Sequence, residues 1–214
     1  MARRLAIGLF AAGLFASSAL AGPGDAEHRA ITAHDRAWAK RINLLLRDLP
    51  AGFRQSSQIP SGSGGLTCSG FSPDLSRFTI TGEASSHEFA RADGIAIFSS
   101  AEVFRSTADQ RGDWAATARR EALPCLREQL QKSVGALGKV ANASLRAAPR
   151  LGERAISFRS SIAVSANGQK ATIWLDVLAV ARGRADATLG VLSVNRAPSA
   201  SLERSLLAKL ASRL

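Results

Sequence analysis

Few side chains of this 214-residue chain are grouped in a way that could support a reaction. The sequence lacks a Gly-x-Ser-x-Gly nucleophile elbow, a His-Glu-x-x-His zinc motif and a calcium-binding loop. Ser85-Ser86-His87-Glu88 places hydroxyls, an imidazole and a carboxylate in succession. Neighbours in a strand point to opposite faces, so this group does not predict a catalytic triad. We therefore expect a protein that is not an enzyme.

The sequence also contains few residues that could bind a metal or a cofactor. Two cysteines and three histidines are too few for a zinc ribbon or an iron–sulfur site, so no cofactor and no metal are expected. Asp109 and Asp113 lie at helical spacing and could form a carboxylate pair. With Arg105 and Arg111 nearby, the pattern favours a solvated charged face instead.

The N-terminus has the three parts of a secretory signal peptide. Arg3 and Arg4 are followed by 17 uncharged residues as far as Ala21, and the small residues at the end of this segment include an Ala19-x-Ala21 cleavage pattern. We predict a signal peptide over residues 1–21 and a mature chain over 22–214. An uncleaved anchor helix is the alternative, although 17 residues barely span a bilayer. Once the signal is cleaved, no stable transmembrane span is expected, and the protein is secreted or associated with the cell envelope.

Cys68 and Cys125 are the only cysteines of the chain. In an oxidising compartment a single pair predicts a disulfide. A catalytic thiol is the alternative, but the sequence pairs no histidine with either cysteine.

The net charge of +11 points to anionic partners. Removal of Arg3 and Arg4 with the signal leaves +9, spread along the chain without a run of five like charges. A diffuse positive field favours anionic cell-wall polymers or lipid headgroups, or is simply a solvated surface. No nucleic-acid-binding motif is present, and nucleic acid is not an expected partner of an exported protein.

The periodicity predicts one α+β domain with an antiparallel sheet and helices packed on its faces. Helices are expected over 25–48, from 106 or 107 to about 120, from Pro124, and from about 198 to the C-terminus; residues 55–65 read as a loop. Strands are expected over 77–81 and 94–104, with a C-terminal meander over 153–164, 171–181 and 184–194. Asn167-Gly168 predicts a tight hairpin turn between the first two strands of the meander.

The meander also supplies the predicted ligand-binding residues. One face of its first strand carries Ile156, Phe158, Ile162 and Val164, which should pack on a helix. The opposite face carries Arg159 among small residues, and its forked donor suits a carboxylate or phosphate. Further residues expected around the same cleft are Trp174, Arg182 and Arg184. The alternative is that a second helix covers this face and that the small residues only allow close packing.

Several segments resemble a known group of exported proteins. They are Leu-Leu-Arg-Asp-Leu-Pro-Ala-Gly-Phe (45–53), Ile-Phe-Ser-Ser-Ala-Glu-Val-Phe-Arg-Ser (97–106), Pro-Cys-Leu (124–126) and Ala-Arg-Gly-Arg-Ala (181–185). Together they resemble the exported sensor-like domains of actinobacteria, similar to the extracytoplasmic sensor domain of mycobacterial receptor kinases and to PsbP-like secreted proteins. The resemblance implies an antiparallel sheet with flanking helices, a non-enzymatic role and a cleft for an extracellular ligand.

Three functions remain open at this point. The first is a secreted binding or sensor-like module for an anionic or lipidic ligand of the cell envelope. The second is a structural or accessory envelope protein that acts through contacts with another protein. The third is a hydrolase with an unrecognised site, which a cleft holding His87 beside a buried carboxylate would favour.

Overall fold

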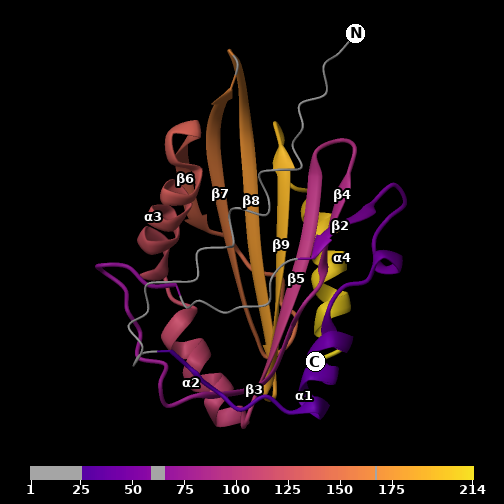
Figure 1. The fold of residues 1–214 in the computed structure, drawn as a ribbon, viewed down its shortest axis with the longest axis vertical. Coiled ribbons are helices and arrows are strands. Elements are labelled where there is room, and N and C mark those ends of the chain that lie inside the picture. Colours follow the sequence, from indigo (N-terminus) through magenta and orange to yellow (C-terminus); the bar gives the residue numbers. More distant parts are fainter. Residues whose placement is uncertain (1–25, 59–65, 167) are drawn as a thin grey trace.

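A computed structural model describes residues 26–58, 66–166 and 168–214 (Figure 1). Its described strands form one mixed, mostly antiparallel sheet with the order β1-β3-β5-β9-β8-β7-β6, to which β4 adds beside β5, and β2 beside β4. β1 is the exception, because it runs parallel to β3. The strand bounds are β1 His28–Arg29, β2 Arg54–Gln58, β3 Thr79–Ser85, β4 His87–Arg91, β5 Ile95–Phe104, β6 Gly138–Leu145, β7 Arg154–Ala166, β8 Gln169–Arg182 and β9 Ala185–Val194.

Helices cover both faces of this sheet, as predicted for a single α+β domain (Figure 1). α3 packs on one face, with α2 beside it, while α1 and α4 pack on the other. The bounds are α1 Ala33–Ile42, α2 Thr107–Thr117, α3 Ala122–Val134 and α4 Ala200–Ala211, with short 3₁₀ turns η2 Leu46–Asp48 and η3 Gly135–Leu137.

The larger core lies between the sheet and the α1–α4 layer. It follows the alternation of β5, β8 and β9, whose inward residues are almost all β-branched, Leu or Ala. Leu206, Leu207 and Leu210 of α4 are at most 1% exposed against it. Arg159 and the small residues of β7 share this face, so a helix does cover the face on which the ligand cleft was expected.

The smaller core lies between the opposite face and α3. Ile162 and Val164 pack there with Leu130 and Val134 of α3. This confirms that the apolar face of β7 packs on a helix. Phe98 fills the space above Gly190, where an added Cβ would lie 1.9 Å from the Phe98 ring.

The predicted β7–β8 hairpin is present. The two strands are antiparallel from end to end, and Ala166 pairs with Gln169 across a two-residue connection. Gly168 has φ +75°, the left-handed conformation that the turn requires. Asn167 lies outside the described residues.

Two predictions near the N-terminus are wrong. α1 begins at Ala33, since Thr32 caps it by accepting a hydrogen bond from the Asp35 backbone N–H (3.1 Å), while His28–Arg29 pair with β3. The first residue of the predicted helix, Asp25, lies outside the described residues. The expected loop over 55–65 begins instead with β2, because β4 supplies its backbone partners.

Cys68 and Cys125 form the predicted disulfide, with their Cα atoms 5.4 Å apart. The bond ties the segment before β3 to α3, where Phe71 and Ala122 pack around it. Such a bond is typical of an oxidising, extracytoplasmic environment. The predicted signal segment, 1–21, lies outside the described residues, and within the described part no helix is long and apolar enough to cross a membrane.

Candidate functional site

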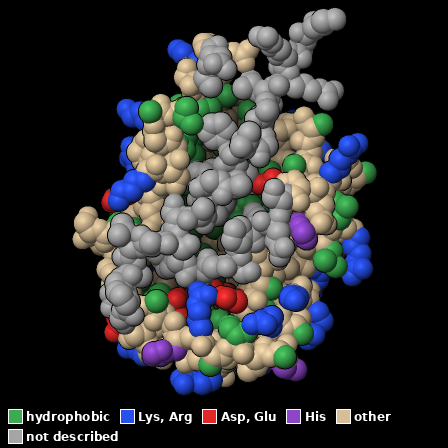
Figure 2. All heavy atoms as spheres, viewed as in Figure 1, with side chains coloured by type: hydrophobic (Ala, Val, Ile, Leu, Met, Phe, Trp, Pro, Cys, Tyr) green, Lys and Arg blue, Asp and Glu red, His purple; other side chains and the backbone are tan. Residues whose placement is uncertain are grey.

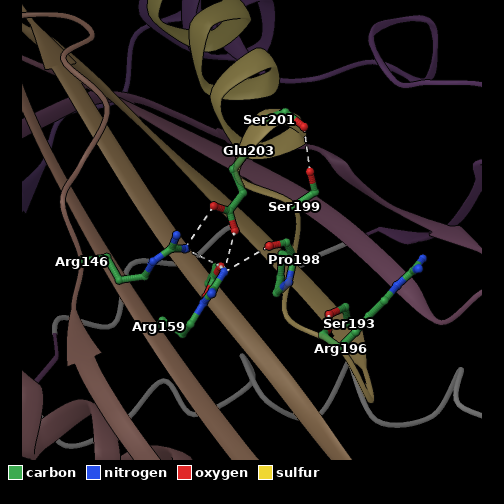
Figure 3. A network of polar contacts seen from close by, with 9 residues as sticks. Arg146, Arg159, Ser193, Arg196, Pro198, Ser199, Ser201 and Glu203 are labelled. Atoms are coloured by element: carbon green, nitrogen blue, oxygen red, sulfur yellow. Dashed lines mark hydrogen bonds and ion pairs between the residues drawn. The ribbon is translucent and has the colours of Figure 1, made fainter.

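Arg159, the central residue of the predicted cleft, lies in a buried ion-pair network beneath α4 (Figure 3). Its Nε donates to Asp176 Oδ1 (2.7 Å), and its Nη2 donates to Asp176 Oδ2, so the pair is bidentate. The same Nη2 also donates to the Pro198 carbonyl (3.3 Å) and to Glu203 Oε1 (3.5 Å). Arg146 Nη1 completes the network with Asp176 (3.0 Å) and Glu203 (3.2 Å).

Two arginines balance two carboxylates in this network. The Asp176 side chain is 0% exposed and that of Glu203 is 3% exposed, so both carboxylates have lost almost all of their water. Burial, together with the nearby Asp176, raises the pKa of Glu203, while the two guanidinium groups oppose this rise. The network fixes the first turn of α4 to β7 and β8. Its arginines have partners within the protein, which argues for a structural role.

Trp174 lies beside Arg159 on the same face of the sheet, as the prediction required. Its register partner on β7 is Ser161, two residues from Arg159. The Arg159 guanidinium carbon lies 5.7 Å from the centre of the Trp174 ring, within cation–π range.

Arg182 and Arg184 lie at the other end of the meander. Arg182 is six residues beyond Asp176 on β8, which corresponds to about 20 Å of strand. Arg184 donates to both oxygens of Asp35 (2.7 and 2.9 Å) and stacks 5.0 Å from the Trp38 ring. The hydrogen bonds from Arg184 lower the pKa of Asp35 despite its burial. The strand-end arginines therefore do not line one cleft with Arg159, and ligand binding at these four residues stays a prediction.

The Ser85–Glu88 group does not form a triad. Ser86 Oγ donates to the His87 carbonyl, and Glu88 accepts from Ser56 Oγ (2.9 Å). His87 Nδ1 is buried and has no hydrogen-bond partner. Within the described part of the chain no carboxylate orients the imidazole, which is what a general base would need.

A basic groove between α3 and β6 is a better candidate for ligand binding. It has a volume of about 560 Å³, with an apolar floor that includes Leu123 and Val140. Lys132 at its wall pairs with Glu128 (2.6 Å). Arg127 and Lys139, both exposed, form no ion pair with any described residue. Their charge is therefore available to a ligand.

A second hollow, the tip groove, continues from the basic groove across β6. It has a volume of about 670 Å³ and is bordered by Lys139 and Lys170, with Leu137 and Val164 among its apolar residues. Lys139 borders both grooves, so the two are adjacent. Figure 2 shows Lys and Arg side chains along the edge of the molecule where Figure 1 places α3 and β6.

Sequence reasoning did not identify the residues of these grooves. Arg127, Lys139 and Lys170 are 12 and 31 residues apart along the chain, and each alone is an ordinary surface cation. They come together because β7 holds β6 on one side and β8 on the other. No spacing in the sequence predicts that these three cations lie close together.

Comparison with known proteins finds no match. No family model matches the chain, and neither a curated protein nor a solved structure is significantly similar to it. The resemblance to exported sensor-like domains therefore rests on the sequence segments alone.

Proposed function

We propose that the protein is a secreted, non-enzymatic binding module of the cell envelope, whose ligand is a phosphate-bearing polymer or lipid headgroup held in the basic groove. The observation that carries this proposal is that three cations, Arg127, Lys139 and Lys170, border two adjacent hollows and lack ion-pair partners among the described residues.

The shape of the grooves favours an extended ligand. Both are open, shallow hollows, and Lys139 lies where they meet. An elongated anion can contact the three cations in turn, while its uncharged parts cover Leu123 and Leu137. The overall positive charge raises the local concentration of such a ligand by long-range attraction.

Charge-neutralising variants at the groove test this proposal. We expect R127Q/K139Q to bind phosphatidylglycerol vesicles or poly(glycerol phosphate) about tenfold less tightly, in line with the loss of two phosphate contacts. The matched control is K40Q/R204Q, which removes two exposed charges from α1 and α4. Equal losses in both variants would mean that diffuse charge, not the groove, attracts the ligand. The two probes distinguish a lipid headgroup from a soluble polymer.

A second candidate function is contact with another envelope protein. Leu45 and Leu46 are adjacent and each is 44% exposed, whereas nearby Leu44 and Leu49 are buried. These two leucines form a small exposed apolar surface that a partner protein could cover. L45S/L46S should leave anion binding unchanged but disrupt an assembly that depends on this surface, which chemical cross-linking of intact cells would detect.

A further inference from the structure

Acidic side chains gather on the α2–α3 face of the sheet. Asp186 of β9 lies directly opposite Glu102 of β5, which lies opposite Glu83 of β3. Side chains of directly opposed residues have Cβ atoms about 5 Å apart, and like charges at this distance destabilise a sheet. In a chain with a net charge of +11, this row of three carboxylates requires an explanation.

Asp113 on α2 faces the same row. Gln110, one helical turn earlier, donates from Nε2 to Asp186 (3.2 Å), so this face of α2 points to the sheet at Asp186. Asp113 is only 7% exposed, and its Oδ1 has no hydrogen-bond partner. The expectation of a solvated charged face for Asp109 and Asp113 is wrong, because both are buried. An unpartnered buried carboxylate oxygen leaves a place for a donor.

The ion pairs of the neighbouring cations are formed with other acids. Arg29 of β1 pairs with Glu83 (2.7 Å). Arg154 of β7 donates to the side-chain oxygen Oε1 of Gln110 and lies 3.8 Å from Glu153, and its charge also lowers the pKa of Asp186. Glu27, just before β1, adds another negative charge to the surroundings. Among the described residues, none forms an ion pair with Glu102, Asp113 or Asp186.

The pKa values of these carboxylates are raised, as expected for buried acids that lie close to one another. Burial, followed by repulsion from Asp186, raises the pKa of Asp113 to about 8. The same two causes raise the pKa of Glu102 well above its usual range. At neutral pH Glu102 and Asp113 therefore hold protons that an approaching cation would displace.

We propose that Glu102, Asp113 and Asp186 form a binding site for an aliphatic polyamine. Among the described residues, no group of three acidic, histidine or cysteine side chains could hold a metal ion, whereas ammonium groups on an alkyl chain can reach carboxylates on separate elements. Glu102 and Asp186 are only partly buried, and Figure 2 shows acidic side chains at the surface where Figure 1 places the ends of β5 and β9 beside α2. Salt screens the net positive charge beyond about 8 Å, so the local carboxylates dominate.

Calorimetric titration of the purified protein with spermidine at 0.15 M salt tests this site. Because binding displaces protons, we expect affinity to rise about tenfold between pH 6 and pH 8, with measurable proton release. E102Q and D113N each remove one carboxylate with little change in shape and should weaken binding at least tenfold. The matched control, E121Q, removes an exposed acid at the start of α3 and should leave binding unchanged.

Two results would overturn the proposal. One is the absence of spermidine binding by folded wild-type protein at pH 8. The other is equal binding by wild-type protein, E121Q, and the cluster variants, which would reveal a non-specific cation atmosphere. If E102Q fails to fold, D113N alone decides, with circular dichroism confirming its fold. The anion-binding result for the basic groove does not bear on either outcome, because the ligand has the opposite charge.

Discussion

Asp176 illustrates how this molecule keeps a carboxylate fully out of water. It accepts from Arg159 in a bidentate geometry and from Arg146 on the same side, so both of its oxygens are satisfied. A bidentate guanidinium–carboxylate pair is among the strongest polar contacts available to a protein. By contrast, Asp113 is nearly as buried and lacks such a partner. The two sites therefore respond to mutation in opposite directions.

We predict that Arg159→Ala destabilises the protein by about 3–5 kcal/mol, because it leaves Asp176 and Glu203 buried with only Arg146 to balance them. Urea unfolding measures the change. Arg204→Ala, at an exposed position of α4, is the control and should change stability by less than about 0.5 kcal/mol. Binding of poly(glycerol phosphate) by the folded variant should be retained. A stable Arg159→Ala variant that has lost binding would instead place Arg159 in the ligand site.

Asp113→Asn should stabilise the protein increasingly as the pH rises from about 4 to about 8. The folded-state pKa of Asp113 is raised from 3.8 to about 8, so the folded protein binds the extra proton between these values and its stability falls as pH rises through them. Near pH 4 the wild type is already protonated, and the variant should match it. At pH 9 we expect the variant to be more stable by about 1–3 kcal/mol, the cost of an unpartnered buried polar group. A pH-independent difference in chemical denaturation would contradict this.

At the scale of elements, β6 shows how an exposed sheet edge is protected. Gln131 of α3 donates to the Gly138 carbonyl (3.1 Å) and accepts from the Val140 N–H (2.9 Å). Its side-chain amide thus takes the place of a neighbouring strand and prevents pairing with another chain. The same contacts hold α3 beside β6 and so shape the basic groove.

Gly82→Ala should displace α1 from the sheet. A Cβ at Gly82 would lie 2.3 Å from the backbone carbonyl of Asp35, which no side-chain rotation can relieve. We expect destabilisation of about 1–3 kcal/mol or more, as for other overpacked cores. Gly70→Ala is the matched control, because nothing lies within 4 Å of its added Cβ. Equal melting temperatures for both variants would show that α1 does not pack this closely on β3.

Local patterns predict some of these elements and not others. The β7–β8–β9 meander and α4 follow from alternation, from Asn167-Gly168 and from leucines at four-residue spacing. β2 has no alternation of its own and exists because β4 pairs with it. The shared face of Arg159 and Trp174 could be predicted from the sequence. The acidic neighbours of Arg159 could not be predicted, because Asp176 and Glu203 contact Arg159 only through strand register and the packing of α4. The Glu102–Asp186 pair could not be predicted either, because its two residues are 84 positions apart in the sequence.

At the scale of the whole molecule, the disulfide joins the segment before β3 to the helical layer that carries the basic groove. The two cysteines are separated by 57 positions in the sequence. In the chain-entropy account, closing a loop of this length stabilises the folded state by about 4 kcal/mol. We therefore predict that the C68S/C125S variant melts about 10 °C lower than the wild type, given about 2–4 °C per kcal/mol for a chain of this size. Differential scanning calorimetry would measure this. An unchanged melting temperature would mean that the described contacts around α3 suffice without the bond.

Among the described residues, charged side chains without ion pairs occur both at the grooves and near α2. Unpaired cations border the α3–β6 grooves, while unpaired carboxylates lie near the junction of α2 with β5 and β9. The division supports recognition of charged ligands, with an anionic ligand at the grooves as the central claim.

Mapping the ligand footprint by NMR tests that claim most directly. On titration with poly(glycerol phosphate), we predict that backbone amide shifts change in α3, in β6 and around Lys170, with little change in α1 or around Leu45. Shift changes spread evenly over the basic surface, or centred on Leu45 and Leu46, would contradict the assignment of the binding function to the grooves.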